Sequence, residues 1–85
     1  MPQPTVASFE EFRSFLSDLL GIAEQVLARD TSFINDLAID SLKLVELMLQ
    51  LERQIGQKIP TDAAWEVQTV GDAYELYARL VRQGA

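Results

Sequence analysis

Apolar side chains recur at steps of three and four residues in three stretches of this chain. That spacing places them on one face of an α-helix, so the pattern predicts amphipathic helices. We expect these helices over residues 8–20, 41–55 and 70–82, with a short helix over residues 61–66 before the last one. A chain of 85 residues is expected to form one domain, residues 1–85, with room for one thin core. The predicted fold class is all-α.

Two of the predicted helices begin with a capping-box sequence. In "SFEE", Ser8 stands three residues before Glu11, and in "TVGD", Thr69 stands three residues before Asp72. At this spacing each side chain can satisfy the backbone amide of the other residue. Asp40 is the expected cap of the middle helix, because aspartate is a favoured residue at that position.

The connection over residues 22–40 is long for a small helical domain, where about two to eight residues usually join two helices. We expect an ordered crossover between two parallel helices, pinned to the core by six apolar side chains. These are Ile22, Val26, Leu27, Phe33, Ile34 and Leu37. Residues 1–7, with two prolines, are expected to form a flexible lead-in.

The helix over residues 41–55 carries two apolar stripes instead of one. The first stripe consists of Leu44, Leu47, Met48, Leu51 and Ile55, and the second of Leu42, Val45 and Leu49. If only the first stripe packs inward, the second faces solvent. Either the helix is buried on two sides, or the second stripe contacts a partner.

The composition argues against an enzyme that works alone. Neither histidine nor cysteine occurs, so the chain lacks the side chain that moves protons most readily near neutral pH. It also cannot form disulfides or thiolate metal sites, and we expect no bound metal. A serine nucleophile of the hydrolase type would need a base such as histidine, so that mechanism is excluded for Ser41.

The formal net charge is −6, and most of it lies early in the chain. Residues 1–40 hold seven acids and two bases, a net of −5, and residues 41–85 hold six acids and five bases. Nucleic acids and anionic membranes bind basic surfaces, so we expect neither as a partner and favour basic proteins instead.

The ends of the chain and its apolar runs bear on where the protein works. No apolar run approaches the ~20 residues that span a bilayer, and we expect no export signal, because residues 1–6 lack a basic region followed by an apolar stretch. We expect a cytoplasmic monomer without membrane insertion. The start at Met1 and the short tails favour a discrete protein over a fragment of a larger synthase.

Ser41 stands where the irregular connection becomes the strongly apolar helix. The simpler interpretation is a helix N-terminus, where aspartate and serine are both favoured. A second interpretation is a site of covalent modification through phosphate. The amides and the positive dipole end of a helix would stabilise a phosphate on the Ser41 hydroxyl.

Several short motifs occur in an order that resembles the acyl carrier protein family. "DSL" at 40–42 follows Phe33, Asp36 and Leu37. It is itself followed by "VEL" at 45–47, "LE" at 51–52, "IP" at 59–60 and "TV" at 69–70. The likeness runs from about Leu20 to Val81, including the length of the connection, and so covers most of the chain.

The resemblance implies a small bundle of three main helices and one short helix. It implies that Ser41, beside Asp40 and Leu42, carries 4′-phosphopantetheine through a phosphodiester, and that the thiol of this arm holds acyl groups as thioesters. The chain would then be a non-catalytic carrier. Its partners would be a phosphopantetheinyl transferase, an acyl-activating or acyltransferase enzyme, and a ketosynthase or another acyl-processing enzyme.

The resemblance also implies two groups of binding residues. Partner enzymes would contact Leu42, Val45, Glu46 and Glu52. Apart from the resemblance, we expect partner contact at Leu49 of the second apolar stripe, at the basic residues Lys43 and Arg53, and at Trp65. An acyl chain could lie in a cavity lined by Met48, Leu51, Ile59, Ala64 and Val67, although ordinary core packing explains these five equally well. We expect Trp65 to be partly exposed near the end of the helix over residues 41–55.

Three residues depart from the pattern of many fatty-acid carriers. Ala38 replaces a glycine, which would cost about 1 kcal/mol if its φ were positive. Lys43 and Arg53 stand at positions that are often acidic, so the charges of residues 41–56 sum to zero. We therefore expect a specialised polyketide, lipid or hybrid peptide pathway.

Two other functions are open. An aminoacyl or peptidyl carrier would use the same arm, but usually has two glycines where this chain reads "LAIDSL". The enzyme that loads the chain would distinguish it from an acyl carrier. An unmodified helical adaptor would bind through the stripe of Leu42, Val45 and Leu49, and the intact Ser41 argues against it.

Overall fold

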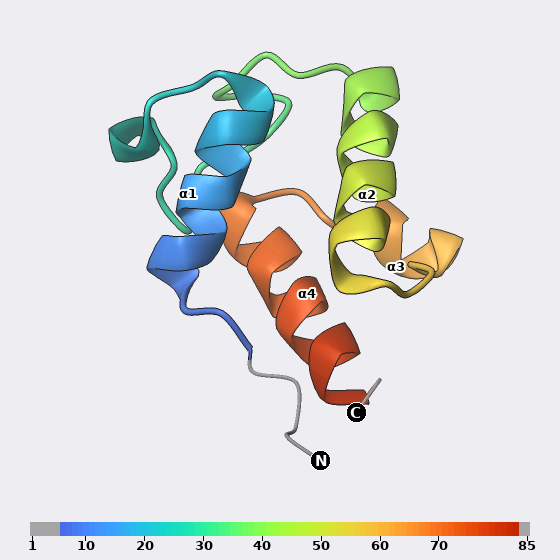
Figure 1. The fold of residues 1–85 in the computed structure, drawn as a ribbon. Helices are drawn as coiled ribbons and strands as arrows, with labels where there is room; N and C mark the ends of the chain where they lie inside the picture. Colours follow the sequence, from blue (N-terminus) through green and yellow to red (C-terminus); the bar gives the residue numbers. More distant parts are fainter. Residues whose placement is uncertain (1–5, 84–85) are drawn as a thin grey trace.

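The structure is a computed structural model that describes residues 6–83, and it is helical. Its elements are α1 (Phe9–Leu20), the 3-10 helix η1 (Glu24–Val26), α2 (Ser41–Ile55), α3 (Thr61–Trp65) and α4 (Val70–Gln83) (Figure 1). The predicted all-α class, with three main helices and one short one, is confirmed. Within residues 6–83, no helix has the length and apolar character needed to cross a bilayer.

Both predicted capping boxes are present. The Ser8 hydroxyl accepts a hydrogen bond from the Glu11 amide (3.1 Å), and the Ser8 amide donates to the Glu11 carboxylate (3.0 Å). The Thr69 hydroxyl accepts from the Asp72 amide (3.1 Å), and the Asp72 carboxylate accepts from the Thr69 amide (3.1 Å). These reciprocal bonds fix where α1 and α4 begin.

Glycines in the left-handed conformation end α1 and α2. Gly21 has φ 68° and Gly56 has φ 70°, and each amide donates to a carbonyl four residues earlier. Glycine adopts this conformation without steric cost, so Gly21 and Gly56 determine where α1 and α2 end.

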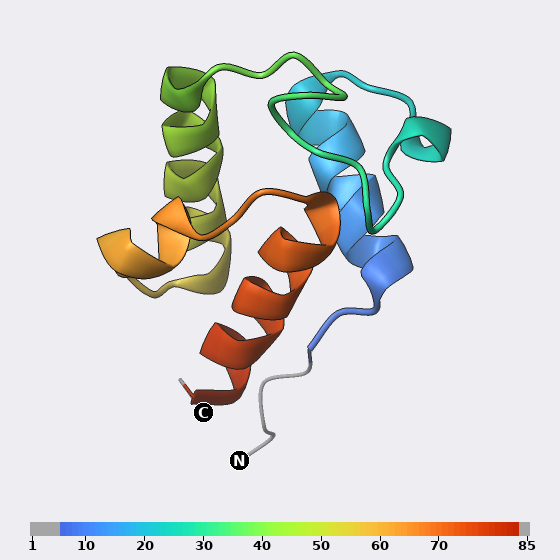
Figure 2. The same cartoon turned by 180° about the vertical axis from the view of Figure 1, so that it is seen from behind.

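The three main helices do not run in the direction that the sequence suggested. α1 ends and α2 begins at the same end of the molecule, so these two helices run in opposite directions, whereas α2 and α4 run the same way (Figures 1 and 2). The expected crossover between two parallel helices is therefore wrong.

The connection between α1 and α2 is long because it reaches the first turn of α4 and returns. The Gly71 amide donates to the Arg29 carbonyl (2.8 Å), the Val70 amide to the Thr31 carbonyl (2.9 Å), and the Phe33 amide to a carbonyl just before α4 (3.0 Å). A Cβ atom on Gly71 would lie 2.8 Å from the Arg29 oxygen, so only glycine allows this approach. The connection thus satisfies amides that the start of a helix leaves without partners.

Two residues of the connection are central to the core. Leu27 and Phe33 are fully buried, and Ile22 and Leu37 are half-buried, as the apolar pattern predicted. Val26 and Ile34 were also expected to face the core, but they are 49% and 55% exposed. The largest fully buried side chains of the core are those of Leu16, Leu27, Phe33, Leu51 and Val70.

Part of the predicted flexible lead-in, residues 1–5, lies outside the described residues. The rest of it is held in place. Val6 and Ala7 are half-buried, the Ala7 amide donates to the Tyr77 hydroxyl (3.0 Å), and the Tyr74 hydroxyl donates to the Ala7 carbonyl (2.8 Å). Tyr74 and Tyr77 of α4 thus bind the backbone ahead of α1.

Candidate functional site

Ser41 is the first residue of α2 and is exposed. Asp40 caps the helix as predicted, since its carboxylate accepts from the Lys43 amide (2.8 Å) and its carbonyl from the Leu44 amide (3.0 Å). Among the side-chain hydrogen bonds found within residues 6–83, none involves the Ser41 hydroxyl. The hydroxyl is therefore free for a covalent bond to an incoming group.

The surroundings of Ser41 suit a phosphate. α2 is 15 residues long, its first turn contains no acidic residue, and the carboxylate of the neighbouring Asp40 is engaged with the Lys43 amide. The amides of a helix N-terminus and the positive end of its dipole point toward this position. A phosphodiester on the Ser41 oxygen would be stabilised there, so the residues present fit the phosphopantetheine arm that the sequence implied.

The backbone just before the serine is constrained. Ile39 is 8% exposed, and its amide donates to the Phe33 carbonyl (2.9 Å). Ala38, one residue earlier, has φ 54°. An energetic cost at Ala38 was expected only if its φ were positive. The φ is positive, so Ala38 adopts the left-handed conformation, which alanine disfavours.

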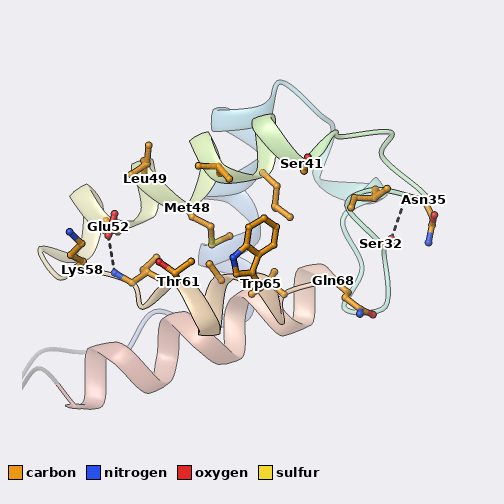
Figure 3. Close-up of a pocket in the computed structure, with 16 residues that line it drawn as sticks. Ser32, Asn35, Ser41, Met48, Leu49, Glu52, Lys58, Thr61, Trp65 and Gln68 are labelled. Atoms are coloured by element: carbon orange, nitrogen blue, oxygen red, sulfur yellow. Dashed lines mark hydrogen bonds between the residues drawn. The ribbon is translucent and has the colours of Figure 1, made fainter.

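A cavity of about 620 Å³ lies between α2, α3 and the residues around Ser32 and Gln68, and Ser41 is among the residues that line it (Figure 3). Four of the five predicted acyl-pocket residues line it: Met48, Ile59, Ala64 and Val67. Met48, Ile59 and Val67 are buried, and Ala64 is half-buried. The cavity wall is thus largely apolar.

Leu51 is the exception and does not line this cavity. It is 1% exposed and contributes to a separate, smaller cavity of about 150 Å³ that also contacts Phe12 and Tyr77. Around the helix axis, Met48 and Glu52 lie within about 20° of Ser41, whereas Leu51 lies about 80° away. The helical period therefore points Leu51 into the core, and its placement in the acyl pocket is corrected.

The second apolar stripe of α2 faces solvent. Leu42, Val45 and Leu49 are 69%, 45% and 50% exposed, so of the two alternatives the sequence left open, burial on both sides is wrong. Val45 and Leu49 also line the cavity, and Leu42 does not. The stripe begins directly beside Ser41 and is available for contact.

The charged residues of α2 differ in what they contact. The Lys43 ammonium lies 3.7 Å from the Glu46 carboxylate, with both side chains more than half exposed, and such surface pairs contribute little stability. Arg53 is exposed in the last turn. Glu52 is half-buried and accepts a hydrogen bond from the Ile59 amide (2.8 Å), so its carboxylate fastens α2 to the following loop.

Trp65 ends α3 and is 70% exposed, which fits the expectation of at least partial exposure near α2. It also lines the cavity, which the sequence did not indicate.

Several other cavity residues were not anticipated. Leu44 and Val45 follow Ser41 by three and four residues, so they lie on the same face of α2 as the serine. This spacing could have identified them as cavity residues. Ile34, Asn35, Lys58 and Thr61 reach the cavity from loops and the start of α3, for which no periodic pattern exists.

Comparison with known proteins agrees with this geometry. Residues 10–76 match the family model described as "Phosphopantetheine attachment site". The chain is 40% identical, over 65 residues, to the acyl carrier protein of Lactobacillus acidophilus. That alignment covers 76% of this chain and 81% of the relative.

Proposed function

The chain belongs to the acyl carrier protein family, whose members share a phosphopantetheine attachment site, and from this premise we propose that Ser41 is the attachment residue. The cofactor of the family is 4′-phosphopantetheine. The observation that carries the assignment is an exposed hydroxyl without a hydrogen-bond partner among the described residues, at the N-terminus of a 15-residue helix. When bound, the arm supplies a thiol that holds acyl groups as thioesters.

The chain presents the serine and leaves the chemistry to other proteins. With no histidine or cysteine it has no side chain suited to proton transfer near neutral pH and no thiol of its own. Asp40 fixes the first turn of α2 through the Lys43 amide, which holds Ser41 exposed. We infer a protein-bound substrate for a phosphopantetheinyl transferase, an acyl-loading enzyme and a ketosynthase or another acyl-processing enzyme.

Contact with these enzymes is proposed for the outer face of α2. The exposed stripe of Leu42, Val45 and Leu49 offers apolar surface next to Ser41. Lys43, Glu46 and Arg53 supply charges of both signs around it. Glu52 is the weakest candidate for partner contact, since its carboxylate is already bonded to the Ile59 amide.

We propose the large cavity as the place where an acyl chain rests. Met48, Ile59, Ala64 and Val67 supply apolar walls, and Ser41 lines the same cavity. An acyl chain held on an arm at Ser41 therefore has an apolar cavity beside the attachment residue.

The mixed charge of α2 supports a specialised polyketide, lipid or hybrid peptide pathway over general fatty-acid synthesis. A surface with Lys43 and Arg53 is a poor match for enzymes that recognise acidic carriers. Loading and elongation by general fatty-acid synthase enzymes, as efficient as with their own carrier, would contradict this proposal.

The attachment is tested by intact mass after incubation with coenzyme A, Mg²⁺ and a broad-specificity phosphopantetheinyl transferase. The wild-type chain is expected to gain one phosphopantetheine. Ser41→Ala is expected to gain none, and Ser14→Ala, a serine on α1, is the matched control that still gains it. No gain by the folded wild type, while a known carrier is modified alongside, would favour the unmodified adaptor.

A further inference from the structure

Exposed apolar side chains gather around one cavity. Six large apolar residues are exposed within residues 6–83, and four of them line the same cavity as Ser41: Ile34, Val45, Leu49 and Trp65. Trp65 has the largest side chain of the four and is 70% exposed. An exposed apolar rim around a cavity indicates a place where an apolar ligand is bound.

Trp65 lies on the least supported helix of the fold. α3 has five residues, none of them buried, and its N-cap Pro60 makes no side-chain hydrogen bond. Ile59 and Val67, which are 6% and 5% exposed, hold the two ends of the segment, and Ala63 and Ala64 pack against the core, whereas Trp65 does not. The indole can therefore move toward α2 without disturbing the buried core.

The position of Trp65 along the cavity is central. In Figure 3 the indole lies along the cavity between Ser41 and Glu52. These two residues are eleven positions apart on α2, which corresponds to about 16 Å of helix axis. The hydrogen bond from the Ile59 amide to Glu52 joins two residues that line the cavity.

We propose that Trp65 is the movable wall of this cavity and packs on an apolar acyl chain carried from Ser41. This proposal rests on the proposed function and adds the residue that selects the cargo. A hydrocarbon chain between the indole and Met48 removes apolar surface of both protein and cargo from water, which favours binding. A two-carbon acyl group offers the indole far less apolar surface than a longer chain does, so Trp65 favours longer apolar chains.

The test uses Trp65 itself as the probe, because it is the chain's single tryptophan. A transferase loads the chain from coenzyme A, acetyl-coenzyme A or octanoyl-coenzyme A, and intact mass verifies each product. The octanoyl form is expected to show emission at shorter wavelength than the other two. Its quenching by acrylamide should fall roughly twofold, since the indole loses about half of its contact with water.

The outcomes separate this proposal from the proposed function. Absence of any mass gain contradicts the attachment at Ser41. Correct masses with equal emission in all three forms overturn the role of Trp65. A shift that appears with the arm alone, or only after a partner enzyme is added, overturns it too, because the indole then contacts the arm or the enzyme.

A second readout uses variants and does not depend on fluorescence. In the wild type, neutral hydroxylamine should cleave the octanoyl thioester severalfold more slowly than the acetyl thioester. Trp65→Ala is expected to remove most of that difference. Val26→Ala, an exposed apolar residue that does not line the cavity, is the matched control and should retain it. Equal protection in Trp65→Ala and wild type would also overturn the proposal.

Discussion

Replacing Ala38 with glycine should stabilise this protein. Ala38 has φ 54°, in the left-handed region, and lies in an irregular segment two residues before Asp40. Its side chain is exposed, so removing the methyl group sacrifices little packing. The substitution therefore acts almost entirely through backbone conformation.

The expected magnitude follows from two opposing effects. Alanine in the left-handed region costs about 1–2 kcal/mol, and glycine adds about 0.5–1 kcal/mol of unfolded-state entropy. The free energy of unfolding of Ala38→Gly should therefore rise by about 0.5–1 kcal/mol. For a domain of this size that raises the Tm by roughly 3–6 °C.

Urea and thermal unfolding followed by circular dichroism measure the change, with the urea m-value expected to stay constant. Ala23→Gly is a matched control, because Ala23 is exposed in the same connection but has φ −60°. There glycine should lower the free energy of unfolding by about 0.4–1 kcal/mol. If Ala38→Gly destabilises the protein as Ala23→Gly does, the reasoning about strain at Ala38 is refuted.

Three further substitutions test contacts described above, each by the free energy of unfolding in urea. Gly71→Ala places a Cβ 2.8 Å from the Arg29 carbonyl and should cost about 1–3 kcal/mol, although alanine favours helices. Tyr77→Phe removes the acceptor of the Ala7 amide and should cost about 1 kcal/mol. Glu52→Ala removes the carboxylate that fastens α2 to the following loop and should cost about 1–3 kcal/mol.

Each of these has an outcome that contradicts it. A gain in stability for Gly71→Ala would mean that the connection can withdraw from α4. Unchanged stability of Tyr77→Phe would show that water replaces the hydroxyl at no cost. For Glu52→Ala the comparison is Glu46→Ala, whose surface ion pair should contribute less than about 1 kcal/mol, and equal costs would count against the fastening role.

Features encoded by neighbouring residues were predictable from the sequence. The capping pairs that begin at Ser8 and Thr69, and the cap at Asp40, each involve residues three positions apart, so the starts of the main helices could be read locally. The position of Ser41 at the start of α2 was also predictable, because Asp40 marks the helix cap and the apolar period follows the serine.

Features set by contacts distant in the sequence were not predictable. The apolar pattern could not distinguish the buried Phe33 from the exposed Ile34, since their difference arises where the connection meets the start of α4. The direction of α2 relative to α1 has the same origin. The misplacement of Leu51 is different, because counting the helical period from Ser41 would have placed it in the core.

The attachment of the connection to α4 has a consequence for the order of events during synthesis. The segment that leads to Ser41 is held by the amides of Val70 and Gly71, which leave the ribosome long after the serine does. Until those residues are available, the connection lacks the bonds that set its path to α2. If Ser41 is the attachment residue, as proposed, we therefore expect its modification to favour chains in which α4 has begun to form.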